Sequence, residues 1–214
     1  MLALTSPYLW YTTRATGMVT LVLFTLVVAL GVLVSTRVGG TIFGRFEVNE
    51  LHRSVSLVAM VFLVIHILTT LLDSYVSTGW FSPIVPFVSE YRRLGVAIGA
   101  IAFDLMLAVW VSSLLKTRVK NTSWRFIHWF SWLAFASAVT HAYLTGTDAK
   151  DGVGLAVVAA CVAFVLASAL WRFFARPTRA AGRTALSPLA VAGGPASSEP
   201  VPTETVPSRS RRRR

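Results

Sequence analysis

Residues 51–72 read LHRSVSLVAMVFLVIHILTTLL, an apolar run with one histidine near its start and another towards its end. From Ser54 to Leu72 the run holds no Asp, Glu, Lys or Arg. A helix of this length spans about 28 Å at 1.5 Å per residue, close to the roughly 30 Å hydrocarbon core of a bilayer. Because lipid offers the backbone no hydrogen-bond partners, such a run must be helical there. The stretch is therefore typical of a membrane-spanning helix.

Four further runs share this length and apolarity, and Asp104 is the only Asp, Glu, Lys or Arg within any of the five. Of the 214 residues, 55% are hydrophobic and 14% are charged, whereas a soluble domain has about 25% charged residues. We therefore predict an all-α polytopic membrane helix bundle of about five transmembrane helices. The other four runs are Gly17–Thr36, Leu94–Leu115, Phe126–Gly146 and Gly152–Trp171.

The net charge of +11 is distributed unevenly over the loops. The first and third loops and the segment after the last run carry most of the Lys and Arg, whereas the opposite side has few, offset by acids. The positive-inside rule then puts the N-terminus outside and the C-terminus in the cytoplasm. It accounts for the basic charge without a nucleic-acid partner. Seventeen of the twenty basic residues are Arg, as in GC-rich bacterial genomes, and we predict a multi-pass protein of the bacterial plasma membrane.

The composition changes at Pro177, which divides the chain into a transmembrane domain, 1–176, and a disordered basic tail, 177–214. The tail holds six of the nine prolines and ends in four arginines, and it has too little apolar surface to fold. It is either attracted to anionic membrane lipid or solvated without a partner. Between Asp73 and Tyr91, two prolines disfavour a regular helix, and we expect this loop to cap the outer surface.

All four histidines belong to the second and fourth helices: His52 and His66 to one, His128 and His141 to the other. The members of each pair are 14 and 13 positions apart, or about 21 and 19.5 Å along a helix. Both helices run in the same direction, so His52 and His128 share the cytoplasmic level, and His66 and His141 the outer level. A haem iron accepts two axial imidazoles, whereas a zinc ion prefers four ligands.

We therefore predict two b-type haems, one at each level. A single histidine in a membrane is more often a packing residue, but ionisable residues at such depths are costly and usually functional. The lone Cys161 excludes an internal disulfide and the paired cysteines of c-type haem attachment. Fourteen positions return a side chain to within about 40° of its starting face, whereas thirteen leave it about 140° away. The fourth helix is thus either distorted, or the two haems lie at different angles around it.

The two spacings on these helices resemble the ferric reductase transmembrane domain. NADPH oxidases, ferric-chelate reductases and the haem-binding membrane subunit of the bacterial methionine sulfoxide reductase system share that domain. The resemblance covers about residues 17–171 and implies that His52 and His128 bind the inner haem, and His66 and His141 the outer haem. The family usually has six helices, with the ligands on the third and fifth, so the first helix is missing here. No glycine-rich nucleotide loop follows the last helix, which brings the chain nearer to the haem-binding subunits.

This resemblance implies a transmembrane electron-transfer protein, an oxidoreductase subunit that needs partner proteins. Its electrons would come from a cytoplasmic flavoprotein, a reduced flavin or a quinol, and would pass to an acceptor on the outer side. A flavin or quinone is the transient cofactor that this scheme allows. Two alternatives stay open: a reductase of ferric iron or oxygen at the outer surface, and a non-redox transporter or scaffold whose histidines pack helices.

Four arginines are candidate partners of haem propionates, which a guanidinium binds bidentately. Arg53 follows His52 directly and Arg125 lies three residues before His128, so both suit the inner haem. Two more, on the outer side, precede the third helix. The alternative for each is an interfacial side chain that reaches towards water. The outer two are Arg92 and Arg93.

Asp104 lies in the middle of the third run. An intramembrane carboxylate is either part of a proton relay, here to a quinone, or a protonated or hydrogen-bonded packing residue, for instance against Ser112 or Thr140. Five aromatic residues near the predicted haems would shorten the electron path, or serve as core and interfacial residues. They are Trp110, Trp124, Trp129, Phe130 and Trp132.

Overall fold

The computed structural model describes residues 7–36, 45–73 and 78–174. Five α-helices and one short 3-10 helix account for most of these residues, and no strand occurs among them. The all-α prediction is therefore confirmed for the described part of the chain. The predicted tail, 177–214, lies outside it. The elements are α1 (Pro7–Thr36), α2 (Arg45–Leu72), α3 (Arg93–Leu114), α4 (Asn121–Thr145), η2 (Asp148–Lys150) and α5 (Gly152–Phe174).

Several helices are longer than the apolar runs that predicted them. α1 begins at Pro7, ten residues before its run, and α2 and α4 also begin early. In the first turns of α1, the hydroxyls of Thr12 and Thr16 donate to the carbonyls of Tyr8 and Thr12 at 2.7 Å. Such bonds satisfy polar side chains within the helix itself. An apolar run therefore marks the membrane-length part of a helix rather than its ends.

Four of the helices, α1, α2, α3 and α5, are long and apolar enough to span a membrane. α4 is not among them, because polar residues such as Arg125 and His128 lower its hydropathy. On α2, Val61 and Leu68 are 57% and 50% exposed, which suits contact with hydrocarbon tails better than contact with water. The protein thus has the features of a multi-pass membrane protein, while a span at α4 and the sidedness of the termini stay predictions.

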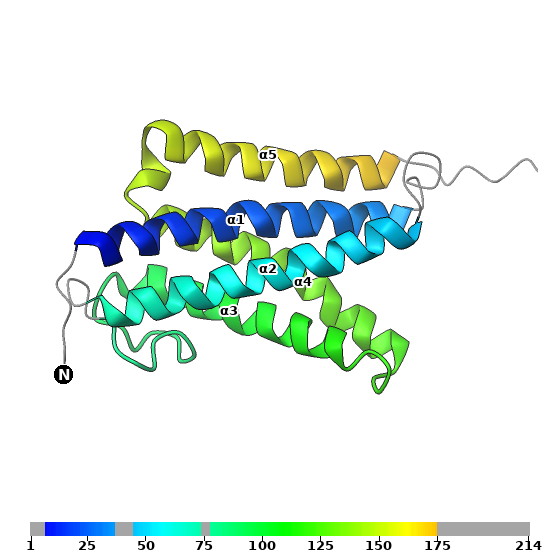
Figure 1. The fold of residues 1–214 in the computed structure, drawn as a ribbon, viewed down its shortest axis with the longest axis horizontal. Helices are drawn as coiled ribbons and strands as arrows, with labels where there is room; N and C mark the ends of the chain where they lie inside the picture. Colours follow the sequence, from blue (N-terminus) through cyan, green and yellow to red (C-terminus); the bar gives the residue numbers. More distant parts are fainter. Residues whose placement is uncertain (1–6, 37–44, 74–77, 175–214) are drawn as a thin grey trace, which may run out of the picture. The chain divides into compact units, whose positions relative to one another are not determined.

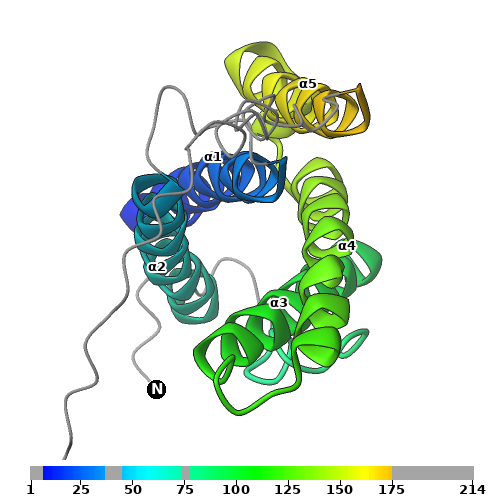
Figure 2. The ribbon, with the colours of Figure 1, turned by 90° about the vertical axis from the view of Figure 1, so that its right-hand side faces the viewer.

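Successive helices run in opposite directions, so α2 and α4 are parallel (Figure 1). α1 packs along α2, and α3 packs along α4, while α1 also contacts α4 and α5. Viewed along the helices, α1 to α4 form a ring and α5 lies outside it against α1 (Figure 2). In this ring α2 and α4 are diagonal neighbours, as two facing sets of histidines require.

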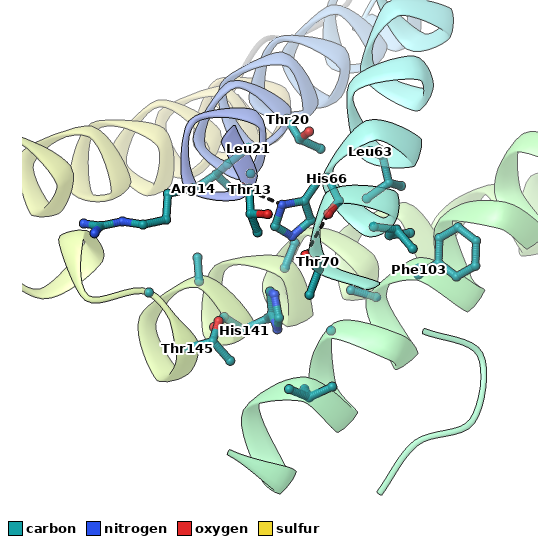
Figure 3. Close-up of a pocket in the computed structure, with 18 of the residues that line it drawn as sticks. Thr13, Arg14, Thr20, Leu21, Leu63, His66, Thr70, Phe103, His141 and Thr145 are labelled. Carbon is teal, nitrogen blue, oxygen red and sulfur yellow. Dashed lines mark hydrogen bonds between the residues drawn. The ribbon is translucent and has the colours of Figure 1, made fainter. Parts of the chain in front are cut away.

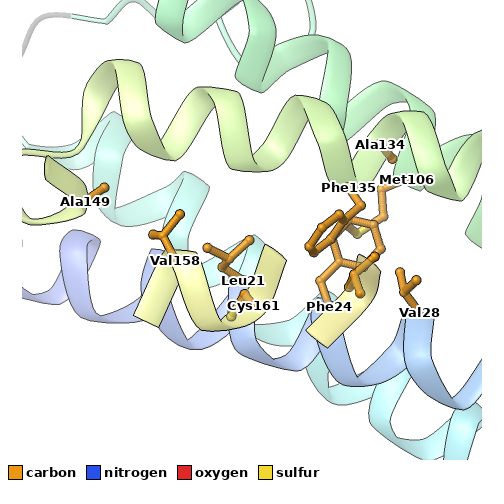
Figure 4. Packing of buried hydrophobic residues seen from close by; sticks show 10 residues of the cluster. Leu21, Phe24, Val28, Met106, Ala134, Phe135, Ala149, Val158 and Cys161 are labelled. Atoms are coloured by element: carbon orange, nitrogen blue, oxygen red, sulfur yellow. The ribbon is translucent and has the colours of Figure 1, made fainter. Parts of the chain in front are cut away.

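The buried core joins the two helical hairpins to α5 (Figure 4). Phe24 of α1 meets Phe135 of α4 edge to face, with ring centroids 5.8 Å apart, a favourable aromatic geometry. Ala134 is fully buried beside them, and Cys161 of α5 is buried as a small apolar residue. Phe135 lies about midway between His128 and His141 in the sequence, and Phe24 packs on it, so the bundle between the two histidine levels contains apolar side chains.

The loop between α2 and α3 forms turns rather than a helix over its described residues, 78–92. Its prolines, Pro83 and Pro86, account for this, as predicted. Ser82 and Ser89 are buried, whereas Trp80 and Phe81 are 56% and 74% exposed. The loop therefore turns its hydroxyls inwards and its aromatic side chains outwards, and we call residues 78–92 the cap loop.

Candidate functional site

The structure brings the four histidines together in two pairs, each joining α2 to α4. The ring centroids of His66 and His141 are 6.4 Å apart, and those of His52 and His128 are 6.3 Å apart. We call His66 and His141 the cap-side pair, and His52 and His128 the basic-side pair, after the cap loop and the lysines and arginines near each. These are the pairs that the two helical spacings predicted, while their binding of haem stays a prediction.

The separation of the rings suits a metal ion held between two imidazoles. A ring nitrogen binds such an ion at about 2 Å and lies about 1.1 Å from its own ring centre, which places two axial rings roughly 6 Å apart. Both observed separations agree with this value. No group of three or more His, Cys, Asp or Glu side chains gathers among the described residues. Each level therefore offers a metal two protein nitrogens, and a macrocycle can supply the other ligands.

Backbone carbonyls fix three of the four rings. The Nδ1–H of His66 donates to the carbonyl of Thr13 at 2.9 Å, and that of His141 to the carbonyl of Gly95 at 2.8 Å. His52 likewise donates to the carbonyl of Val27 at 3.0 Å. A carbonyl only accepts, so Nδ1 carries the proton and Nε2 keeps its lone pair. This is the tautomer that binds a metal through Nε2.

A glycine accompanies each of these bonds, four residues after the carbonyl. Gly17 follows Thr13, Gly31 follows Val27, and Gly99 follows Gly95 at this interval. A Cβ at Gly99 would lie 2.4 Å from His141 Nδ1, and one at Gly17 would lie 2.9 Å from His66 Cε1. At the remaining glycine the distance to His52 Cε1 is a looser 3.4 Å. The missing side chains let the imidazoles approach a carbonyl that already serves the helix ladder.

His128 is held differently from the other three. Its Nδ1 is buried and has no hydrogen-bond partner within the described residues. Its ring instead stacks on Trp124, with centroids 5.0 Å apart and an interplanar angle of 30°. α4 is continuous between His128 and His141, so the helical-phase problem is not solved by a break in the helix. The supports of the two rings differ: His141 donates to a backbone carbonyl, whereas His128 stacks on Trp124.

A cavity of about 280 Å³ lies beside the cap-side pair. His66 and His141 point towards one another across it (Figure 3). Its lining is mainly apolar and comes from α1 to α4, the cap loop and η2. Thr13 is one of the lining residues, and its hydroxyl is buried without a hydrogen-bond partner among the described residues. An apolar cavity with two converging imidazoles fits the largely apolar body of a haem.

Arg14 is a cavity-lining residue that the sequence did not single out. Its guanidinium forms an ion pair with Asp148 and lies 4.0 Å from the ring centroid of Trp10. Both residues also line the cavity. Nothing in the sequence distinguishes Arg14 from other interfacial arginines, because its position depends on the packing of α1 against η2. It is better placed than Arg92 or Arg93 to meet an anionic group in this cavity.

The four predicted propionate partners lie elsewhere. Arg92 donates from one guanidinium nitrogen to the carbonyls of Leu144 and Thr145, both at 2.9 Å. Arg93 donates to the carbonyl of Phe87 at 2.8 Å. Arg92 thus binds the last carbonyls of α4, and Arg93 fixes the cap loop. The other two, Arg53 and Arg125, are exposed, and a propionate contact stays a prediction for all four.

Asp104 is half-buried on α3 and does not line the cavity. The hydroxyls proposed as its partners bond within their own helices, Ser112 to the carbonyl of Val109 and Thr140 to that of Ala136, both at 2.9 Å. These bonds use the hydroxyl protons and leave the oxygens able to accept from a protonated carboxyl, so the packing role of Asp104 stays a prediction. Its role in proton transfer also stays a prediction.

Comparison with known proteins gives one family. Residues 8–148 match the model described as a domain of unknown function (DUF8596). This segment contains the whole ring of four helices with all four histidines, and it excludes α5. No curated protein and no solved structure matches the chain. Since the match covers about two thirds of the 214 residues, the chain belongs to the DUF8596 family.

Proposed function

We propose that this protein carries electrons across a membrane through two b-type haems, one held by each histidine pair. The observation that carries the proposal is the repetition of one geometry at two depths. Ring separations of 6.3 and 6.4 Å recur at positions 14 residues apart on α2 and 13 apart on α4. A single packing histidine needs no such partner, whereas two stacked bis-histidine sites do.

The chain's own residues supply binding, orientation and exclusion of water. When bound, haem supplies one-electron chemistry. Carbonyls of α1 and α3 hold three imidazoles in the tautomer with a free Nε2. Between the levels, the Phe24–Phe135 contact fills the bundle with apolar side chains. The two sites are about 20 Å apart along the helices, and Phe24 and Phe135 would lie in the interval that an electron has to cross.

The same proposal gives the protein five membrane spans, including α4, with the N-terminus outside and the C-terminus in the cytoplasm of a bacterial cell. Lys116 and Arg125 lie near the basic-side pair, and the positive-inside rule assigns that side to the cytoplasm. Electrons then enter from a cytoplasmic flavoprotein, reduced flavin or quinol, and leave to an acceptor outside. The ferric reductase-like resemblance agrees with this direction. In this proposal the four histidines bind the two haem irons. The acceptor on the outer side determines which compound is finally reduced.

A vesicle assay tests the proposed transfer. The purified protein is reconstituted into liposomes that enclose ferricyanide, an impermeant oxidant, and dithionite is added outside together with an ionophore that removes the membrane potential. The proposal predicts reduction of the enclosed ferricyanide by the native protein and its loss in His141→Ala. Reduction no faster than in protein-free liposomes contradicts it. The Cys161→Ala variant, away from both histidine pairs, is the matched control for reconstitution.

Partner dependence has its own measurement. Oxidation of NADPH needs a hydride acceptor such as flavin, positioned against the nicotinamide by a folded site. We expect the purified protein to remain oxidised with NADPH alone and to be reduced once a flavin reductase or a quinol is added under anaerobic conditions. Prompt reduction by NADPH alone would contradict the role of a partner-dependent subunit.

A further inference from the structure

Three of the histidine rings donate to a backbone carbonyl that lies four residues before a glycine, whereas His128 does not. We call this arrangement the glycine rule. His66 and His52 are 14 residues apart on α2, and the glycines opposite them on antiparallel α1, Gly17 and Gly31, are also 14 apart. On α4, His128 lies 13 residues before His141. The same antiparallel register therefore predicts that the residue opposite His128 lies 13 positions after Gly99 on α3. That residue is Ser112, not glycine.

The helix register offers a reason for the missing hydrogen bond of His128. By the glycine rule, the ring would donate to the carbonyl four residues before Ser112, which belongs to Ala108. Ser112 is 7% exposed, and its hydroxyl donates to the carbonyl of Val109 at 2.9 Å. By this register, the Ser112 side chain stands at the position that glycine holds at the other three sites. His128 Nδ1 has no partner within the described residues.

Stacking replaces that bond. Trp124, one helical turn before His128, stacks on the imidazole with ring centroids 5.0 Å apart and planes inclined by 30°. The indole N–H of Trp124 donates to the hydroxyl of Ser113 at 3.5 Å. The ammonium of Lys116, on the turn between α3 and α4, lies 4.1 Å from the Trp124 ring centroid. Trp124 is thus fixed from two directions, and the ring of His128 lies against it.

We propose that Ser112 and Trp124 are positioning residues: Ser112 keeps the His128 ring from a backbone carbonyl and Trp124 holds it by stacking, which together make the basic-side haem easier to reduce. The inference rests on the proposed function, because it concerns a haem bound at this pair. A hydrogen bond to Nδ1–H raises the basicity of a metal-bound imidazole, which favours ferric over ferrous iron. At the cap-side pair both ligands have this bond, whereas at the basic-side pair only His52 has it. The nearby Lys116 charge acts in the same direction, because it stabilises the reduced, less positive iron.

The first test removes only the side chain of Ser112. In Ser112→Gly, His128 can reach the Ala108 carbonyl, and we expect the midpoint potential of the basic-side haem to fall. The expected change is about tenfold in the ratio of reduced to oxidised iron at a fixed potential, or about 59 mV for one electron. Ser112→Ala keeps the Cβ and loses the hydroxyl, so its potentials should equal those of the native protein. Both are measured by redox titration of the full-length, haem-loaded protein.

The second test concerns the ring plane of His128. The angle between two axial imidazole planes sets the splitting of the iron d orbitals, and the largest g value of the ferric low-spin EPR signal follows it. Trp124→Leu removes the stack and should change this g value for the basic-side haem alone. Trp124→Phe keeps an aromatic face and should restore it. This pair keeps the inference testable if Ser112→Gly does not fold.

The outcomes separate the inference from the proposed function. A native protein without haem would overturn both. Two bound haems with potentials unmoved by Ser112→Gly, or moved equally at both sites, would overturn the inference alone. So would an unchanged EPR signal in Trp124→Leu, or a drop in potential in Ser112→Ala as large as in Ser112→Gly.

Discussion

The cap-side and basic-side pairs have nearly the same ring separation, 6.4 and 6.3 Å, but they are supported differently. Both rings of the cap-side pair bond to backbone carbonyls, and each lies against a glycine. In the basic-side pair, His52 has this support, while His128 stacks on Trp124. The angles between the ring planes differ as well, 79° and 57°.

This difference separates two properties of a ligand site. The antiparallel register of the helices sets which histidines meet and how far apart they lie. The neighbouring helix sets how each ring is oriented and how strongly it donates to a metal. We expect one side chain in place of glycine to change the second property without changing the first.

The largest effect is expected from removal of the ligands themselves. His66→Ala and His141→Ala should each abolish the same haem, and His52→Ala and His128→Ala the other, leaving one haem per chain in every variant. Pyridine haemochrome assays and redox titration of the four variants provide the measurement. Loss of the same redox component in His52→Ala and His141→Ala would show that the pairing is wrong.

Substitution of the cap-side glycine on α3 should come next. In Gly99→Ala the new Cβ would lie 2.4 Å from His141 Nδ1, so the ring must move from the carbonyl of Gly95. Loss of such supporting contacts costs about 10–100-fold in metal affinity, and we expect a decrease of this size for the cap-side haem only. Gly31→Ala is the matched control, because its Cβ would meet His52 at an ordinary 3.4 Å. Equal haem loss in both variants would refute the role of close approach.

A smaller difference is expected between the two haems of the native protein. Because hydrogen bonds support both ligands only at the cap-side pair, that haem should have the lower midpoint potential. The expected ratio between the sites is about tenfold, or about 59 mV for one electron. Redox titration resolves the two steps, and the single-histidine variants assign them. A cap-side haem that is reduced first would reverse the comparison.

The smallest effect concerns Arg92, which binds the last carbonyls of α4 beside the cap-side pair. Arg92→Gln should lower the free energy of unfolding by about 1 kcal/mol, since the site is exposed and water partly replaces the lost bonds. Thermal unfolding in detergent measures this, with Arg118→Gln, an exposed residue between α3 and α4, as the control. A decrease of several kcal/mol would mean that Arg92 has contacts beyond these carbonyls.

The sequence predicted the parts of this arrangement that depend on position along a helix. Apolar runs indicated five helices, and the histidine spacings indicated which rings share a level. Helix ends were less predictable, because polar turns such as those around Thr12 extend α1 beyond its apolar run. Asp104 and the four arginines were chosen for charge and place along the chain, which do not specify the facing helix.

The supports of the rings depend on the register between neighbouring helices, which the sequence does not state. Once α1 is known to run antiparallel to α2, it becomes informative that Gly17 and Gly31 are 14 residues apart, the same interval as between His52 and His66. The same holds for Ser112, which looks like any other small helical residue until α3 is aligned with α4. Arg14 was missed for this reason too, because its pairing with Asp148 joins segments far apart in the chain.

The most direct measurement of the central claim is the haem content of the purified, full-length protein expressed with haem available. The account predicts two b-type haems per chain, both extractable into acidified organic solvent, with the reduced-minus-oxidised spectrum of six-coordinate, low-spin centres. One haem per chain would mean that one histidine pair only packs helices. A colourless protein, with no haem by the pyridine haemochrome assay, would contradict the account.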